Sequence, residues 1–313
     1  MNKRNFNIKI KKIQYNKNDL LSLELEGKDI NFVTINTIRR VCYNNIPTYT
    51  FDPNLVKITN NTSVYNNDYM RLRISNFEID IENDEKNIEK SDILKEENEE
   101  TSNDDIDSIT MYCNNENSNT NIKNITTDHC VFYKNGNQIE NPYKMPNLIC
   151  KLKQNEKLQF SATTSLGVGI KNGIYTPCCC YYEEINDNKF ILNIESICQL
   201  SELDILKRAC IYIKNKLSKI KDYLVGRNFT KNNKGDIILK NENHTIGNII
   251  TYGIQDHNNI EFCGYKLNHL LIEEVTISYI TDGAKSINII INETMSKQIN
   301  KFDYILNLIQ KIK

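Results

Sequence analysis

The feature of this sequence that most constrains its fold is a short series of elements that occurs twice. In the first copy, residues 21–25 alternate leucine with polar residues, which is the period of a half-buried strand. With Asp29 as the expected N-cap, apolar residues at three- and four-residue spacing, including Phe32 and Ile35, then predict a helix. A strand-like segment through residues 56–58 follows.

The same order recurs in the last third of the chain. Residues 237–239 predict a short strand, and residues 241–243 predict the turn after it. Ile246 and Ile250 then mark a second helix, and residues 262–265 predict the return strand. Strand, turn, helix and strand in both places indicate two copies of one fold unit.

Each copy also ends in a predicted helix that carries an uninterrupted apolar stripe. The first stripe comprises Leu203, Leu206, Cys210, Ile213, Leu217, Ile220 and Leu224. The second comprises Met295, Ile299, Phe302, Leu306 and Ile309. Alternating spacings of three and four are typical of helices that pack along a seam, rather than of a cofactor site. We therefore expect the two terminal helices to pack against one another.

These patterns divide the chain into three parts. The first repeated unit is discontinuous and covers residues 1–58 and 167–225, with a β-rich domain inserted at residues 59–166. The second repeated unit covers residues 226–313. Within the insertion, residues 80–107 hold thirteen acidic residues against three lysines and lack an apolar period, so we expect a flexible acidic segment. The remainder of the chain is net basic, which suits a protein that works on or near nucleic acid.

The residues that could carry chemistry do not combine into a catalytic site. The glycines of residues 167–173 miss the spacing of a phosphate-binding loop, and the adjacent cysteines 178–180 would alternate between the faces of a strand. His244 has no nucleophile or paired carboxylate, so we expect it to hydrogen-bond backbone or to pack at the seam. Structural zinc is not expected either, because no paired spacing occurs among Cys113, Cys130 and Cys150.

Two motifs identify a family. The first is NTIRRV at residues 36–41 with IPT at 46–48, and it resembles the signature helix of the bacterial α subunit and of the third-largest subunit of RNA polymerase II. The second is ENHTIGN at residues 242–248 with FCGY at 262–265, and it is similar to the small eleventh subunit and its archaeal counterpart. The resemblance implies an α+β fold in which two α-subunit-type dimerisation units form a pseudo-dimer inside one chain. Such fused subunits occur in large DNA viruses with cytoplasmic replication.

The resemblance also implies a role in polymerase assembly. Asn36, Arg39 and Arg40, with both guanidinium groups directed outwards, would dock the largest and second-largest subunits. Other small polymerase subunits are further expected partners, DNA is contacted only through the complex, and no homo-oligomer is expected. The expected pseudo-dimer interface comprises Phe32, Ile35, Leu203, Leu206, Cys210, Ile213, Leu217, His244, Ile246, Gly247, Ile250, Ile299, Phe302, Leu306 and Ile309.

The resemblance predicts a non-catalytic scaffold for DNA-templated transcription. Nucleotidyl transfer, with its Mg²⁺, would take place on the largest subunits, and no cofactor is expected in this chain. No apolar run approaches a membrane span, so we expect an intracellular protein: in host cytoplasm, viral factory and virion if viral, or in the nucleus if cellular. The alternative is a free-standing nucleic-acid-binding protein, but no strand interleaves aromatic and basic residues.

Overall fold

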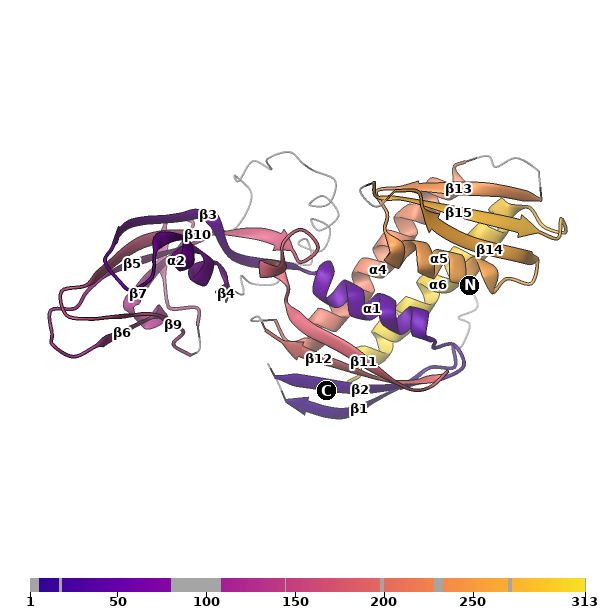
Figure 1. Ribbon diagram of the computed structural model, residues 1–313. Helices are drawn as coiled ribbons and strands as arrows, with labels where there is room; N and C mark the ends of the chain where they lie inside the picture. Colours follow the sequence, from indigo (N-terminus) through magenta and orange to yellow (C-terminus); the bar gives the residue numbers. More distant parts are fainter. Residues whose placement is uncertain are drawn as a thin grey trace. The chain divides into compact units, whose positions relative to one another are not determined.

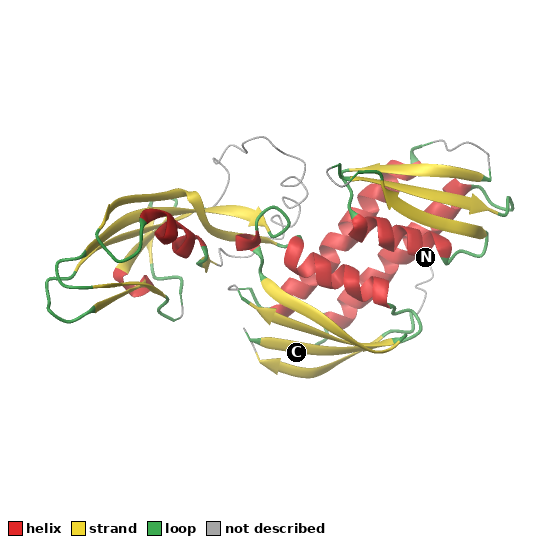
Figure 2. Ribbon diagram, viewed as in Figure 1, coloured by secondary structure: helices red, strands yellow, loops and turns green. Residues whose placement is uncertain are grey.

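The computed structural model describes residues 6–16, 19–79, 108–143, 145–197, 200–227, 233–269 and 272–312. These residues form two compact units, which are described separately (Figures 1 and 2). Unit 1 contains the chain up to residue 46, residues 178–197 and the chain from residue 201 onwards, whereas unit 2 contains residues 47–177. The acidic segment at residues 80–107 lies outside the described residues.

The first half of unit 1 is an antiparallel four-stranded sheet with two helices. The strand order is β1-β2-β12-β11, so Leu23 of β2 lies opposite Leu192 of β12 although the two are distant in sequence. Leu21, Leu23 and Leu25 of β2 are buried, as their alternation predicted. Ser22 is buried too, and it donates a hydrogen bond to Asn193 Oδ1 at 2.6 Å. The elements of this half are β1 (Lys9–Asn16), β2 (Leu20–Glu26), α1 (Phe32–Asn44), β11 (Cys178–Asn186), β12 (Lys189–Ser196) and α4 (Glu202–Val225).

The start of α1 differs from the prediction. Its N-cap is Asn31, whose Oδ1 accepts a hydrogen bond from the Thr34 backbone N–H at 2.9 Å. Asp29 instead accepts one from the Asn7 backbone N–H at 2.7 Å, because the chain makes a tight turn before the helix. Gly27 allows this turn, since its φ is +147° and a Cβ there would lie 1.9 Å from the Asn7 carbonyl oxygen.

The second half of unit 1 is a smaller version of the first. Its sheet has the order β13-β15-β14, and Ile277 of β15 lies opposite Ile237 on one side and Tyr265 on the other. Asn243 caps α5, because its Oδ1 accepts the Thr245 backbone N–H at 3.0 Å. The elements of this half are β13 (Lys234–Lys240), α5 (His244–Gln255), β14 (Ile260–Leu267), β15 (Glu274–Thr281) and α6 (Ile287–Ile309).

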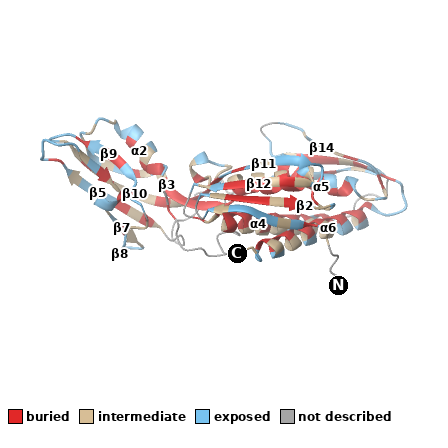
Figure 3. Cartoon of the chain, turned by 90° about the horizontal axis from the view of Figure 1, so that it is seen from below, coloured by how far each residue is buried: buried red, intermediate tan, exposed pale blue. Residues whose placement is uncertain are grey.

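The four helices of unit 1 lie between its two sheets (Figures 1 and 2). Helix α4 packs on α6 and α1 packs on α5, so each half contributes one helix to each of these two pairs. Buried and exposed residues alternate along α4 and α6 in Figure 3, as the apolar stripes predicted. The α+β prediction with two repeated units is therefore confirmed.

Unit 2 is built on an antiparallel six-stranded sheet of order β4-β3-β10-β5-β7-β8, with a separate two-stranded sheet of β6 and β9. Its core is continuous and includes Phe51, Phe132 and Phe160. The elements are β3 (Pro47–Asn61), α2 (Asn67–Ser75), β4 (Glu78–Ile79), β5 (Ile109–Glu116), β6 (Lys123–Thr126), β7 (Cys130–Lys134), β8 (Asn137–Ile139), β9 (Leu148–Leu152) and β10 (Lys157–Val168), with single 3₁₀ turns at Thr127–His129 and Gly173–Tyr175.

The edges of unit 2 differ from the predicted insertion at residues 59–166. Strands β3 and β10 pair from Asn61 opposite Leu158 to Pro47 opposite Val168, with two irregularities in register, so both strands belong entirely to unit 2. The second repeated unit, predicted at residues 226–313, packs its helices on those of the first, as a pseudo-dimer requires, and both therefore belong to unit 1. Within the described residues, no helix combines the length and apolarity that a membrane crossing requires.

Candidate functional site

The helices of unit 1 bring most of the predicted interface residues into its buried interior. The buried ones are Ile35, Leu203, Leu206, Cys210, Ile213, Leu217, Ile246, Gly247, Ile250, Phe302, Leu306 and Ile309. Ile299 is half-buried. Phe32 is 50% exposed, but its ring meets Tyr252 of α5 edge-on, with 6.3 Å between the ring centroids. The first and second halves therefore meet through α1 and α5 as well as through α4 and α6.

Two predicted interface residues lie elsewhere. Gly247 is buried against its own sheet, because a Cβ at this position would lie 2.9 Å from Val275 Cγ1 and 3.0 Å from Tyr265 Cδ2. The glycine allows α5 to approach β14 and β15 closely, rather than serving the contact with the first half. His244 is exposed at the start of α5, where its Nδ1 lies 3.4 Å from the Tyr265 hydroxyl.

Polar contacts across the two halves were not predicted from the sequence. Lys216 Nζ on α4 forms an ion pair with Glu242 Oε1 at 2.9 Å, and the two side chains are only 8% and 6% exposed. Lys301 Nζ on α6 donates a hydrogen bond to Thr34 Oγ1 on α1 at 2.9 Å. Burial lowers the pKa of Lys301 to about 8. These polar residues are isolated in the sequence and follow no periodic pattern. Their pairing therefore became visible only in the packed structure.

The three predicted docking residues form a patch on α1 with two different arginine environments. Arg39 donates from Nε and Nη2 to Asn36 Oδ1 at 3.1 and 2.9 Å, and its guanidinium lies 5.5 Å from the centroid of the Tyr43 ring. Its orientation is therefore held by its own helix. Asn36 and Arg39 are half-exposed, which leaves this patch open on the described surface.

Arg40 has a different environment from Arg39. The residue is half-buried, its Nε is covered by the protein, and no described atom accepts a hydrogen bond from that Nε–H. Its charge acts on Tyr265 of the second half: burial raises the pKa of Tyr265, and Arg40 partly opposes this rise. Arg40 of the first motif and Tyr265 of the second are thus close enough for the charge of the arginine to act on the phenol.

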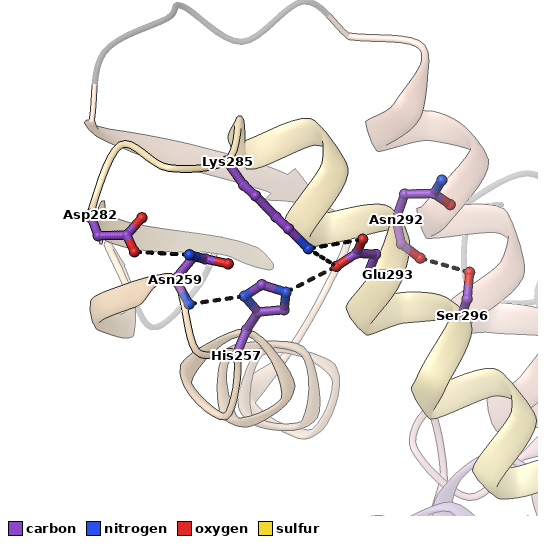
Figure 4. Close-up of polar contacts among 7 residues, drawn as sticks. All are labelled: His257, Asn259, Asp282, Lys285, Asn292, Glu293 and Ser296. Atoms are coloured by element: carbon purple, nitrogen blue, oxygen red, sulfur yellow. Dashed lines mark hydrogen bonds and ion pairs between the residues drawn. The ribbon is translucent and has the colours of Figure 1, made fainter. Parts of the chain in front are cut away.

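A groove of about 660 Å³ is lined mainly by the second half, together with Phe6 of the first, and contains several titratable groups. Glu293 accepts hydrogen bonds from Lys285 Nζ at 2.9 Å and from His257 Nε2 at 3.0 Å (Figure 4). The bond from Lys285, and after it the bond from His257, lowers the pKa of Glu293. His257 Nδ1 accepts the Asn259 backbone N–H at 3.2 Å, and Asn259 in turn donates to Asp282. Both ring nitrogens and the carboxylate already have partners, so this network joins the end of α5 to α6 and leaves no poised base.

The cysteines of unit 1 behave as core residues. Cys178 and Cys180 of β11 face inwards with Cys42 of α1, whereas Cys179 is exposed, as expected for successive residues of a strand. Burial raises the pKa of Cys210 to about 12. In the part of the chain that the structure describes, no three His, Cys, Asp or Glu side chains are placed to hold a metal ion.

Comparison with known proteins identifies both halves. Residues 23–217 and residues 234–307 each match the model of the RNA polymerase Rpb3/Rpb11 dimerisation domain. A putative DNA-directed RNA polymerase subunit of Acanthamoeba polyphaga mimivirus is 31% identical over 161 residues, which cover 50% of this chain and 45% of that protein. The chain thus spans about half of that relative's length. Two matches in one polypeptide agree with the two helix-and-sheet halves of unit 1, and the chain therefore belongs to the Rpb3/Rpb11 family of RNA polymerase subunits as a fused, α-like member.

Proposed function

We propose that this chain is a non-catalytic assembly subunit of a DNA-directed RNA polymerase, in which one polypeptide does the work of an α-type dimer. Its two halves would form the platform that docks the second-largest subunit mainly through the first half and the largest mainly through the second. Nucleotidyl transfer and its Mg²⁺ would belong to those partners. The covalent connection holds the halves at an effective concentration of roughly millimolar, so the pair need not assemble from separate chains.

The observation that carries this proposal is Arg40. Its Nε–H has no acceptor among the described residues, and its charge acts on Tyr265 of the second half. A half-buried arginine without an internal carboxylate is suited to an acceptor from outside, where a guanidinium can bind a carboxylate or backbone carbonyls through two hydrogen bonds. Arg39, already oriented by Asn36, would add a second such contact with little loss of side-chain entropy.

Co-expression of this chain with the two largest subunits tests the proposal. Affinity purification of the wild-type chain should recover both large subunits, and Arg40→Glu should reduce their recovery at least tenfold, because the reversed charge would face their acceptors. Arg71→Glu is the matched control: Arg71 lies on α2 of unit 2, is similarly exposed and pairs with Asp68 at 2.9 Å. It should leave recovery unchanged. Circular dichroism and thermal melting establish that each variant is folded.

Two outcomes would contradict the proposal. Recovery of both large subunits at normal yield by a double Arg39→Glu, Arg40→Glu variant would remove the docking role from α1. Tight binding of DNA by the isolated chain, falling steeply with salt and independent of any other subunit, would favour the free-standing nucleic-acid-binding alternative. That alternative also predicts no co-purification with the polymerase.

A further inference from the structure

Unit 2 contains two thiols that neighbouring strands place face to face. Cys113 lies on β5 and Cys130 on β7, and the antiparallel ladder sets these two residues directly opposite one another. Opposite residues in such a ladder have Cα atoms about 4.5 or 5.5 Å apart. Both spacings lie within the range of about 4.4–6.8 Å that a disulfide spans, so the backbone need not move for a bond to form.

The side chains around the pair distinguish its two sulfurs. Cys113 Sγ accepts a hydrogen bond from Asn115 Nδ2 at 3.5 Å, and Asn115 is itself bound by Lys123 Nζ at 3.3 Å. Cys130 Sγ lies 3.8 Å from the Thr126 carbonyl oxygen, to which its S–H can donate. The neighbouring Cys130 thiol lowers the pKa of Cys113 most, burial opposes this, and Asn115 lowers it further, whereas the Cys113 thiol raises the pKa of Cys130. The one Cys130 S–H can point either to Cys113 or to the Thr126 carbonyl. The Asn115 amide beside the Cys113 sulfur, with the Lys123 ammonium behind it, makes Cys113 the thiol better placed to be held as a thiolate.

The pair is reachable from one side. Cys113 is only 2% exposed, but Cys130 is half-buried at the start of β7, so the pair can be reached from the side of Cys130. Cys150 of β9 lies near enough to affect the titration of Cys130, yet the three thiols do not form a group placed to hold a metal ion. Structural zinc sites need four ligands in tetrahedral arrangement. The arrangement suits a dithiol rather than a metal centre.

We propose that Cys113 and Cys130 form a redox modification site, which a peroxide converts from a dithiol into a disulfide. The Cys113 thiolate attacks one peroxide oxygen, the O–O bond breaks, and hydroxide leaves to become water with a proton from solvent. The Cys130 sulfur then attacks the resulting sulfenic acid, forming the S–S bond and breaking the S–O bond. The second hydroxide leaves with the Cys130 proton as water, so the two thiols supply both electrons that reduce the peroxide.

The bond would close a loop that includes β6 and the residues on either side of it. Closing a loop restricts the open states of the chain, so the oxidised form should open less often between β5 and β7. Amide hydrogen exchange of residues 117–126 should slow on oxidation and recover after reduction. Exchange in unit 1, whose own cysteines are mostly in its core, should not change.

Peptide mapping of the full-length chain tests the proposal. The purified, reduced protein is treated with stoichiometric hydrogen peroxide under native conditions, free thiols are alkylated, and the digest is analysed without reduction. We expect one cross-linked species that joins the Cys113 and Cys130 peptides and is lighter than their sum by two hydrogens. Reduction should restore both separate peptides.

Variants and a metal analysis complete the test. Cys130→Ser should abolish the cross-link and leave Cys113 over-oxidised, whereas Cys150→Ser and the exposed-thiol control Cys179→Ser should retain it. Alkylation of both Cys113 and Cys130 after peroxide treatment, or cross-linking of either one to Cys150 in the wild-type chain, would overturn the proposal. So would stoichiometric zinc in the native protein that Cys130→Ser loses. The wild-type mapping does not depend on whether any variant folds.

Discussion

The ion pair between Lys216 and Glu242 offers a direct test of how the two halves are held together. Lys216 lies on α4 of the first half, and Glu242 precedes α5 of the second, within the ENHTIGN motif. Their atoms are 2.9 Å apart and both side chains are almost completely buried. Lys216→Met keeps a long unbranched side chain but leaves the Glu242 carboxylate in the interior without this cation.

The expected loss follows from the burial of the pair. Removing one partner of a buried ion pair costs about 3–5 kcal/mol, because the remaining charge has lost its water without keeping its counter-charge. An exposed pair contributes only about 0–1 kcal/mol. The same helix supplies the matched control: Lys214 pairs with Asp303 of α6 at 2.8 Å, but these side chains are 35% and 47% exposed. Lys214→Met should therefore cost no more than about 1 kcal/mol.

Urea denaturation followed by far-ultraviolet circular dichroism measures both variants at neutral pH and moderate salt. We expect the free energy of unfolding of unit 1 to fall by about 3–5 kcal/mol for Lys216→Met, with little change in the denaturant slope. Adding Glu242→Gln should restore much of this loss, since the second change removes the buried carboxylate that has lost the Lys216 ammonium. The coupling energy of the double-mutant cycle should then lie near the upper end of about 0.5–3 kcal/mol.

A particular result would refute this reasoning. If Lys216→Met costs no more than Lys214→Met, water must reach the pair, and the junction of the halves is not the dry interior described above. If the double variant is as unstable as Lys216→Met alone, the loss comes from packing around the methionine and not from the loss of the Lys216 ammonium beside the carboxylate. Either result would leave apolar packing as the main stabilisation of the junction.

Two further predictions concern the same unit. The pKa of Lys301 is about 8 in the folded chain, against an ordinary value of 10.5. Between these pH values the unfolded chain binds more protons than the folded one, so the free energy of unfolding should rise by about 3 kcal/mol as pH increases from 8 to 10.5. Urea denaturation across this range should show a rise that Lys301→Met abolishes, and an equal rise in the variant would contradict the burial of the ammonium. Gly247→Ala should destabilise unit 1 by about 1–3 kcal/mol, because the new Cβ meets Val275 Cγ1 and the Tyr265 ring. A Cβ at Gly253 on the same helix would meet Gln298 Nε2 at 2.8 Å and Thr294 Cγ2 at 3.0 Å. The nearer of these atoms is the end of a flexible side chain that can turn away, so Gly253→Ala should cost less than Gly247→Ala. Thermal melting of the two variants shows whether this order holds.

Local patterns in the sequence predicted much of unit 1. The alternation of residues 21–25 and the stripes on the two terminal helices depend only on which residues are apolar and how they are spaced. Those properties are set within about ten neighbouring residues, so they can be read without knowing the fold. The two motifs added the family, and the comparisons confirmed it for both halves.

The predictions that needed distant contacts were less accurate. The boundary of the inserted unit was placed inside β3 and β10, because a ladder between strands about a hundred residues apart leaves no mark in either strand alone. Gly247 was assigned to the contact between halves, yet it serves the approach of α5 to its own sheet. The N-cap of α1 was misplaced by two residues for a similar reason, since Asp29 is engaged by Asn7.

By itself, the sequence determined that this protein has two related helix-and-sheet halves with apolar helix faces, because hydrophobic periodicity is a local property. Only the tertiary structure decided which groups face each other: Lys216 with Glu242 and Lys301 with Thr34 in unit 1, and Cys113 with Cys130 in unit 2. Such pairs depend on how distant segments pack, and a charge or thiol looks the same in sequence whether it is solvated or buried. The repeated unit defines the family, and the packing between the two halves of unit 1 and within unit 2 provides the features that can now be tested.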